Sequence, residues 1–145
     1  MQIIGFNLTK ISIEKKEKIP VQLKINQGID IKEVSKEVIP FSSNEALKML
    51  FNFTISYSED SAKLEFEGNL ILLPDKNEAK TFLKEWKNKK VPENARIPLF
   101  NFIMNKCNIK ALQLEDELGI PYHIPMPRVN PNNPNNPNNN PENKK

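Results

Sequence analysis

The chain has 145 residues, 38% of them hydrophobic and 27% charged, and its formal net charge is +3. One folded, soluble domain fits this composition, and the single cysteine excludes both an intramolecular disulfide and a multi-cysteine zinc site. Arginine occurs only as Arg96 and Arg128, which argues against sequence-specific nucleic-acid recognition, and no signal peptide or bilayer-spanning apolar stretch is present, so we expect a cytoplasmic protein without membrane insertion.

Four segments in the first half alternate apolar and polar residues with a period of two, which predicts half-buried strands. The segments are residues 3–13, 21–31, 46–58 and 63–73. The alternation slips by one position near Thr9 and Lys10, which predicts a bulge, and Gly28 predicts a kink in the second strand. A polar turn separates the third and fourth segments, so these two should form a hairpin.

The apolar spacing becomes helical after Pro74. Asp75 is followed three residues later by Glu78, a capping-box pattern that predicts the start of a first helix. A second helix with a wide apolar stripe is predicted over residues 92–107, beginning or kinking at Pro98, because proline disrupts a helix interior. A third, short helix is predicted over residues 111–118, ending at the glycine that follows.

Strands followed by helices predict an α+β domain, in which a four-stranded antiparallel sheet carries two to three helices on one face. The other face would carry Ile3, Leu50, Ile71 and Leu73, and this apolar surplus indicates self-association or a site for apolar partners. We expect the domain to span residues 1–129. Residues 130–145, rich in asparagine and proline, should form a disordered tail because they contain no apolar residue.

The side chains that could support catalysis form no recognisable catalytic motif. His123 has no nucleophile motif beside it, so we interpret it as a bystander, and Cys107 ends an apolar helical stripe as a small buried hydrophobe. The carboxylates at residues 115–117 are adjacent in the chain and are interpreted as a solvated face. With no phosphate-binding loop either, we predict that the protein is not an enzyme and binds no metal or cofactor. The lysines of residues 84–90 are typical of a solvated helix end, and weak binding of RNA or of an acidic partner is the alternative.

The stretch RIPLFNFIMNKCNIKALQLEDELGIP, placed after four antiparallel strands, resembles the core of the SecB family of export chaperones. The frame formed by GFNLTKISIE, CNIKALQLEDELGIP and IPMP is similar to a group of uncharacterised archaeal SecB-like proteins. The resemblance implies a SecB-like fold and a homo-oligomer, a dimer or tetramer. It also implies an ATP-independent holdase that binds unfolded or nascent polypeptides in apolar grooves, with a link to protein export.

The prolines at positions 121, 125 and 127 should stiffen residues 120–129, a segment that we call the strap. If the resemblance holds, we expect the strap to form one wall of the client groove. The expected client-binding residues are Leu50, Phe100, Met104, Leu112, Leu114, Ile120, Ile124 and Met126. The alternative function is that of an oligomeric adaptor with one specific protein partner.

Overall fold

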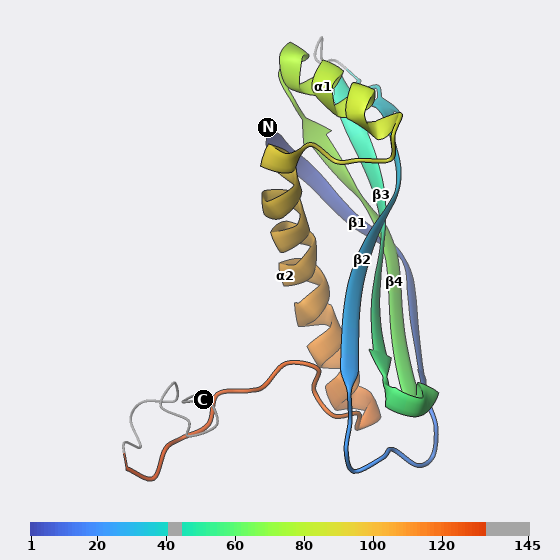
Figure 1. Cartoon of the computed structure of the whole chain (residues 1–145), viewed down its shortest axis with the longest axis vertical. Helices are drawn as coiled ribbons and strands as arrows, with labels where there is room; N and C mark the ends of the chain where they lie inside the picture. Colours follow the sequence, from blue (N-terminus) through green and yellow to red (C-terminus); the bar gives the residue numbers. More distant parts are fainter. Residues whose placement is uncertain (41–44, 133–145) are drawn as a thin grey trace.

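A computed structural model describes residues 1–40 and 45–132 of the chain (Figure 1). Its elements, in chain order, are β1 (Gln2–Lys15), β2 (Ile25–Glu37), β3 (Ala46–Tyr57), β4 (Ala62–Leu73), α1 (Lys76–Trp86) and α2 (Glu93–Leu118). A short 3-10 turn, Ser58–Asp60, joins β3 to β4. The predicted α+β architecture is confirmed: four antiparallel strands are followed by helices.

The strands lie in the order β1-β4-β3-β2, so β1 and β2 are the edges of the sheet. The predicted hairpin of β3 and β4 forms, with Leu47 opposite Leu72, and the predicted bulge in β1 lies between Leu8 and Lys10. The kink predicted at Gly28 is wrong, because this residue pairs in register with a residue of β3.

The irregularity of β2 lies instead between Ile31 and Glu33. Ile29, Ile31 and Val34 all face the core, although regular alternation would place Glu33, not Val34, on the same face as Ile31. A bulge between Ile31 and Glu33 accommodates the extra residue. The strand also begins later than predicted, at Ile25, and Val21 is fully exposed. β2 therefore pairs with β3 along the whole length of β3, and the outer edge of β2 lies beside α2 (Figure 1).

The core lies between the sheet and α2. Every second residue of β3 from Leu47 to Tyr57 is buried, and α2 packs on this face through a ridge of residues spaced by four. The ridge consists of Leu99, Ile103, Cys107, Ala111 and Glu115. Full burial of one large aliphatic side chain contributes about 1.5–3 kcal/mol, so this interface dominates the stability of the domain.

The helix α1 covers one end of the sheet and begins as predicted (Figure 1). The N–H of Glu78 donates to Oδ1 of Asp75 at 2.8 Å, and the N–H of Asp75 donates to Oε1 of Glu78 at 3.0 Å. The first of these hydrogen bonds is the main reason why the pKa of Asp75 lies below its usual range. The predicted capping box is therefore confirmed.

The second and third predicted helices are one helix, α2, and it runs without interruption from Glu93 through Pro98 to Leu118. The prediction of two separate helices was wrong, because no helix-ending residue stands between Cys107 and Ala111. The helix ends at Gly119, whose φ of 67° is left-handed, and the N–H of the next residue, Ile120, donates to the carbonyl of Glu115 at 2.9 Å. This Schellman arrangement reverses the chain and directs Ile120 into the core.

The face of the sheet that α2 does not cover is more polar than predicted. Leu50, Ile71 and Leu73 are half-buried on this face, but Ile3 pairs with Leu72 and belongs to the helix-covered face. A register shift directly after Ile3 explains why simple alternation misplaced it. Within residues 1–40 and 45–132, neither helix has the length and apolar content needed to cross a membrane.

Candidate functional site

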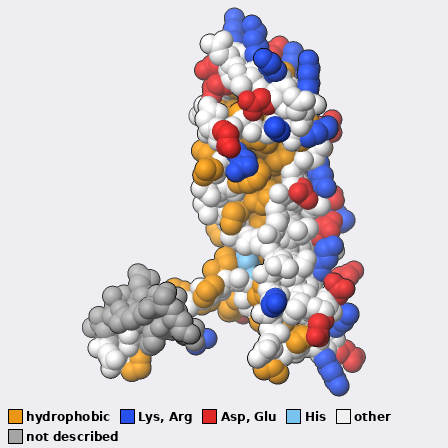
Figure 2. Space-filling model, in the orientation of Figure 1, with side chains coloured by type: hydrophobic (Ala, Val, Ile, Leu, Met, Phe, Trp, Pro, Cys, Tyr) orange, Lys and Arg blue, Asp and Glu red, His pale blue; other side chains and the backbone are white. Residues whose placement is uncertain are grey.

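A groove runs between the outer edge of β2 and the N-terminal half of α2. A cavity of about 740 Å³ has Ile29, Ile31, Trp86, Val91 and Phe100 among its apolar lining residues. A second cavity of about 220 Å³ lies next to it and shares Ile29 and Phe100, and we call the two neighbouring cavities together the groove. Figure 2 shows hydrophobic side chains gathered along this part of the surface, with charged side chains around them.

The rim of the groove carries charges of both signs. The lining includes three acidic and three basic side chains: Asp30, Glu85, Glu93, Lys89, Lys90 and Arg96. The ammonium of Lys89 lies 4.9 Å from the ring centroid of Trp86, a distance at which a cation–π interaction holds it over the apolar lining. An apolar lining with a balanced rim favours a ligand that is apolar in its middle and mixed in charge.

The edge of β2 provides the groove with main-chain hydrogen-bonding groups. Because β2 is the last strand of the sheet, no strand among the described residues pairs with its outer side. A free strand edge is a template on which an extended peptide can form main-chain hydrogen bonds. The groove therefore places main-chain hydrogen-bonding groups beside apolar side chains.

Two of the expected client-binding residues lie in this groove. Phe100 and Met104 form one wall of its narrower part, opposite Gln27, Gly28 and Ile29 of β2. Leu50 cannot contribute to the same floor, because Met49 and Phe51 on either side of it point toward α2 and Leu50 points to the other face. Grouping Leu50 with Phe100 and Met104 was therefore wrong.

The other expected client-binding residues have different surroundings. Ile120 is only 3% exposed and belongs to the core, because the Schellman turn directs it inward. Leu112 and Leu114 are half-buried on α2, and Ile124 is half-buried in the strap. Met126 is 49% exposed, which leaves it available to a partner.

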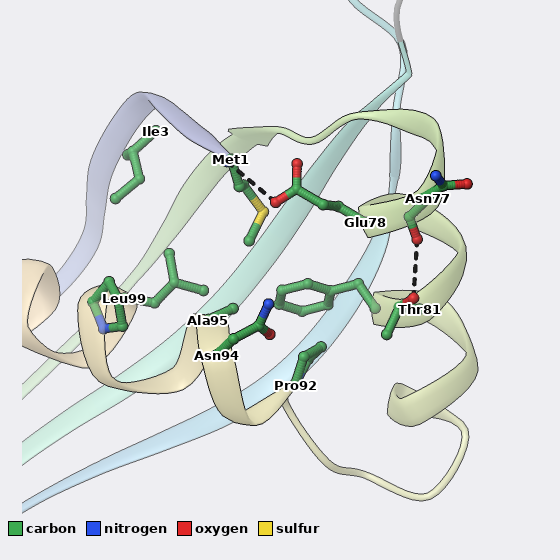
Figure 3. Close-up of a pocket in the computed structure, with 11 residues that line it drawn as sticks. Met1, Ile3, Asn77, Glu78, Thr81, Pro92, Asn94, Ala95 and Leu99 are labelled. Atoms are coloured by element: carbon green, nitrogen blue, oxygen red, sulfur yellow. Dashed lines mark hydrogen bonds and ion pairs between the residues drawn. The ribbon is translucent and has the colours of Figure 1, made fainter.

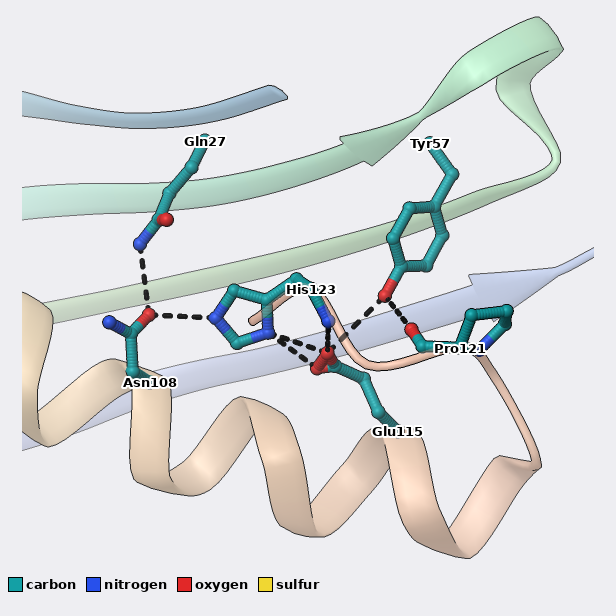
Figure 4. A network of polar contacts seen from close by, with 6 residues as sticks. All are labelled: Gln27, Tyr57, Asn108, Glu115, Pro121 and His123. Atoms are coloured by element: carbon teal, nitrogen blue, oxygen red, sulfur yellow. Dashed lines mark hydrogen bonds and ion pairs between the residues drawn. The ribbon is translucent and has the colours of Figure 1, made fainter. Parts of the chain in front are cut away.

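His123 is not a bystander: it is the centre of a buried polar network (Figure 4). Its Nδ1 lies 2.5 and 2.7 Å from the two carboxylate oxygens of Glu115, and its main-chain N–H donates to Oε1 of the same residue at 2.8 Å. The side chains of both residues are 0% exposed. The interpretation of Glu115 as part of a solvated face was wrong, although its neighbours Asp116 and Glu117 are exposed.

The network connects the strap to two strands as well as to α2. Nε2 of His123 lies 2.9 Å from Oδ1 of Asn108, which also accepts a hydrogen bond from Nε2 of Gln27 in β2. On the other side, the hydroxyl of Tyr57 in β3 lies 2.5 Å from the carbonyl oxygen of Pro121 and 3.3 Å from Oε1 of Glu115. Burial, together with the nearby Glu115 carboxylate, raises the pKa of Tyr57 well above its usual range.

These contacts make the network structural. Both ring nitrogens of His123 face side-chain oxygen atoms, so each has a hydrogen-bonding partner. A buried network of hydrogen bonds fixes the strap and α2 in one relative position. No group of three or more histidine, cysteine or carboxylate side chains within the described part of the chain is arranged to hold a metal ion. Cys107 is fully buried as predicted, and burial raises the pKa of its thiol to about 12.

A separate cavity of about 340 Å³ lies between the start of β1, α1 and the first turns of α2 (Figure 3). Met1, Ile3, Ala95 and Leu99 line it, and the amino group of Met1 lies 3.2 Å from a carboxylate oxygen of Glu78. This cavity is smaller than the groove and does not border a strand edge of β2.

Several groove residues were missed by the sequence analysis. Ile29 and Ile31 were predicted only as part of the second strand, and Trp86 was not assigned to the site. Their contribution depends on the docking of β2 beside α2, which no local pattern encodes. A usable signal was the wide apolar stripe of the second helix, which includes Phe100 and Met104 and indicated burial on two sides.

No protein-family model matches the chain, and no curated protein matches its sequence. Among solved structures, the chain is similar to a SecB-like chaperone of Mycobacterium tuberculosis, Rv1957, in complex with a ChAD peptide from the Rv1956 HigA1 antitoxin. The TM-score is 0.51 at 16% sequence identity, and the match covers 86% of this chain and 85% of that one. At this identity the likeness is one of fold, and the fold of the chain is SecB-like.

Proposed function

We propose that the protein is a cytoplasmic, ATP-independent holdase that binds unfolded or nascent polypeptides in the groove between β2 and α2. The observation that carries the proposal is that two neighbouring cavities, both lined by Ile29 and Phe100, border the outer edge of β2. A site of this kind binds by main-chain pairing and apolar burial, neither of which requires a particular client sequence.

The size of the groove suits a short extended segment. Burying about 100 Å² of apolar client surface contributes about 2.5 kcal/mol, so a few apolar side chains are enough for weak, reversible binding. Flexible side chains such as that of Met104 can repack around clients of different shape. Weak and adaptable binding is what a holdase needs in order to release its clients.

The solved neighbour gives independent support. It is a SecB-like chaperone in complex with a peptide, so a protein of this fold binds polypeptide. The likeness extends over most of both chains, so it concerns the α+β domain and not a single motif. We infer further that the protein acts as a dimer or tetramer and contributes to protein export, as its sequence resemblance to SecB chaperones implies.

The test is binding of extended peptides and suppression of aggregation. We expect the protein to reduce light scattering from a chemically denatured client and to bind several unrelated labelled peptides with similar Kd values, without ATP. If the protein neither reduces light scattering nor binds the peptides, the proposed holdase function is wrong.

Two matched variants locate the site on α2. Met104→Asp places a charge on the wall of the groove and should weaken peptide binding by about tenfold or more, which corresponds to about 1.4 kcal/mol. Ile97→Asp places the same charge on the same helix at a residue that is 63% exposed and outside the groove, and it should change Kd less than twofold. Equal losses in the two variants would contradict the assignment of the groove.

The alternative function is an oligomeric adaptor with one specific partner, which the half-buried apolar residues of the uncovered sheet face would favour. An adaptor predicts one dominant species in a pull-down, unchanged when protein synthesis is blocked. A holdase predicts many captured chains that disappear under the same block.

A further inference from the structure

The strap approaches the groove from the C-terminal end of α2. The left-handed Gly119 reverses the chain, and four residues later the ring of His123 contacts Asn108, so the strap runs back along the helix. Asn108 lies one helical turn from Met104, a groove residue, and it is hydrogen-bonded to Gln27, which lines the groove on the β2 side. His123 therefore stands at one end of the groove (Figure 4).

The outer half of the strap, residues 124–129, leaves the body of the domain at this point (Figure 1). Met126 is 49% exposed and Val129 is 63% exposed, although both are apolar. The inner half is held firmly by His123 and by the burial of Ile120. The segment begins beside an open apolar groove, so a covering surface for Met126 and Val129 lies within its reach.

The prolines give this segment an unusual hydrogen-bonding pattern. Pro125 and Pro127 have no N–H, and each restricts the residue before it to extended conformations. In an extended segment, alternate residues direct their N–H groups to the same side, so the donors of Ile124 and Met126 lie on one side and the prolines on the other. Such a segment can pair with a strand edge on one side and cannot be extended by another strand on its other side.

The length of the segment also matches the groove. Five steps of extended chain, from residue 124 to residue 129, span roughly 17 Å at about 3.3 Å per residue. The wall of the groove from Asn108 to Arg96 covers twelve helical residues, or roughly 18 Å at about 1.5 Å per residue. The segment thus reaches from its anchor at His123 to the far end of the groove and no further.

We propose that residues 124–129 close over the groove of their own chain and pair with the outer edge of β2 beside Phe100 and Met104. The strap is then a built-in competitor of the client, and the prolines on its outer side prevent further strands from adding to the sheet. The competition rests on the holdase function proposed above, whereas the closure itself does not depend on it.

The closure can be tested with cysteine pairs, because the native Cys107 is fully buried and its raised thiol pKa keeps it unreactive. In the full chain, Ile31→Cys combined with Met126→Cys places one thiol on β2 in the groove and one on the segment. We expect an intrachain disulfide under mild oxidation, at a rate independent of protein concentration. In the control pair, Asn7→Cys with Met126→Cys, the first thiol lies on β1 at the opposite side of the sheet, and oxidation should be about tenfold slower or more.

Equal rates in the two pairs, or disulfides that link two molecules, would overturn the proposal. A second measurement uses proteins without added cysteines. Met126→Pro removes a main-chain donor from the pairing side and should increase hydrogen exchange at residues 28–32 of β2, whereas Pro125→Ala should leave it unchanged. Unchanged exchange in both variants would count against closure. If closure is observed but added peptide does not slow disulfide formation, the holdase function fails and the closure stands.

Discussion

Nδ1 of His123 lies 2.5 Å from Oε1 of Glu115, and neither side chain has any exposed surface. The pair joins a strap without regular secondary structure to the last turn of α2. Removal of one side chain leaves the other buried with only part of its hydrogen bonds, which makes the pair a sensitive point of the fold.

We predict that His123→Ala and Glu115→Ala each lower the free energy of unfolding by about 1–3 kcal/mol. Because each variant loses the same interaction, the double variant should be less destabilised than the sum of the two single variants. Urea unfolding followed by circular dichroism measures all three. Tyr122→Phe removes an exposed hydrogen bond to Asp116 in the same region and should have little effect. Additive losses at His123 and Glu115 would show that the two residues do not interact.

A second prediction concerns the close approach of β1 and β4. A Cβ atom on Gly68 would collide with the main-chain oxygen of Asn7 and lie 2.8 Å from the ring of Phe51. Gly68→Ala should therefore destabilise the protein by about 2–3 kcal/mol through overpacking. Gly28→Ala is the matched control, because its Cβ would meet only Oγ1 of Thr54 at 3.5 Å, an ordinary contact. Thermal unfolding separates the two, and equal Tm values would contradict the packing argument.

A third prediction follows from the pKa of Cys107, which burial raises to about 12. The thiolate is the reactive form, so a thiol reagent at pH 8 should modify the folded protein slowly and the urea-unfolded protein rapidly. The unfolded thiol ionises at lower pH than the folded one, so its contribution to stability is complete below about pH 8.5 and declines as the pH rises toward 12. Cys107→Ser should remove this alkaline component. Rapid labelling of the folded protein at pH 8 would contradict the burial.

A fourth prediction concerns the pKa of Asp75, which is lowered mainly by the hydrogen bond from the N–H of Glu78. A lowered pKa means that ionised Asp75 favours the folded state, and this contribution is complete above the usual value of 3.8. As the pH falls below 3.8, the contribution should disappear. Asp75→Asn keeps a capping side chain without the charge, so the difference in Tm between wild type and variant should shrink in that range. A difference that does not vary with pH would exclude the charge as its source.

The sequence predicted those parts of the fold that depend on neighbours in the chain. The β3–β4 hairpin, the bulge after Leu8 and the capping box at Asp75 are all encoded by local spacing. The bulge of β2 and the side of the sheet on which Ile3 lies depend on register against a distant strand, and local alternation misplaced both.

The groove and the polar network are harder to predict because they join distant segments. Phe100 and Met104 were expected in the site because of their apolar stripe, but Ile29 reaches the site only through the docking of β2 beside α2. Likewise, Glu115 belongs to an acidic stretch that is typical of solvent-facing helix surface. Its burial becomes intelligible only when the strap returns and places His123 against it.

The other edge of the sheet, β1, is fourteen residues long, and its two register shifts, after Ile3 and after Leu8, divide it into short stretches. A long, flat edge would invite copies of the protein, or the unfolded chains around it, to stack into aggregates. Bulges twist the backbone and interrupt the row of main-chain donors and acceptors. The irregular β1 is thus a safeguard against aggregation, and it makes the two edges of the sheet unequal: β2, with one register shift, is the more regular edge for an extended segment, and β1, with two, resists one.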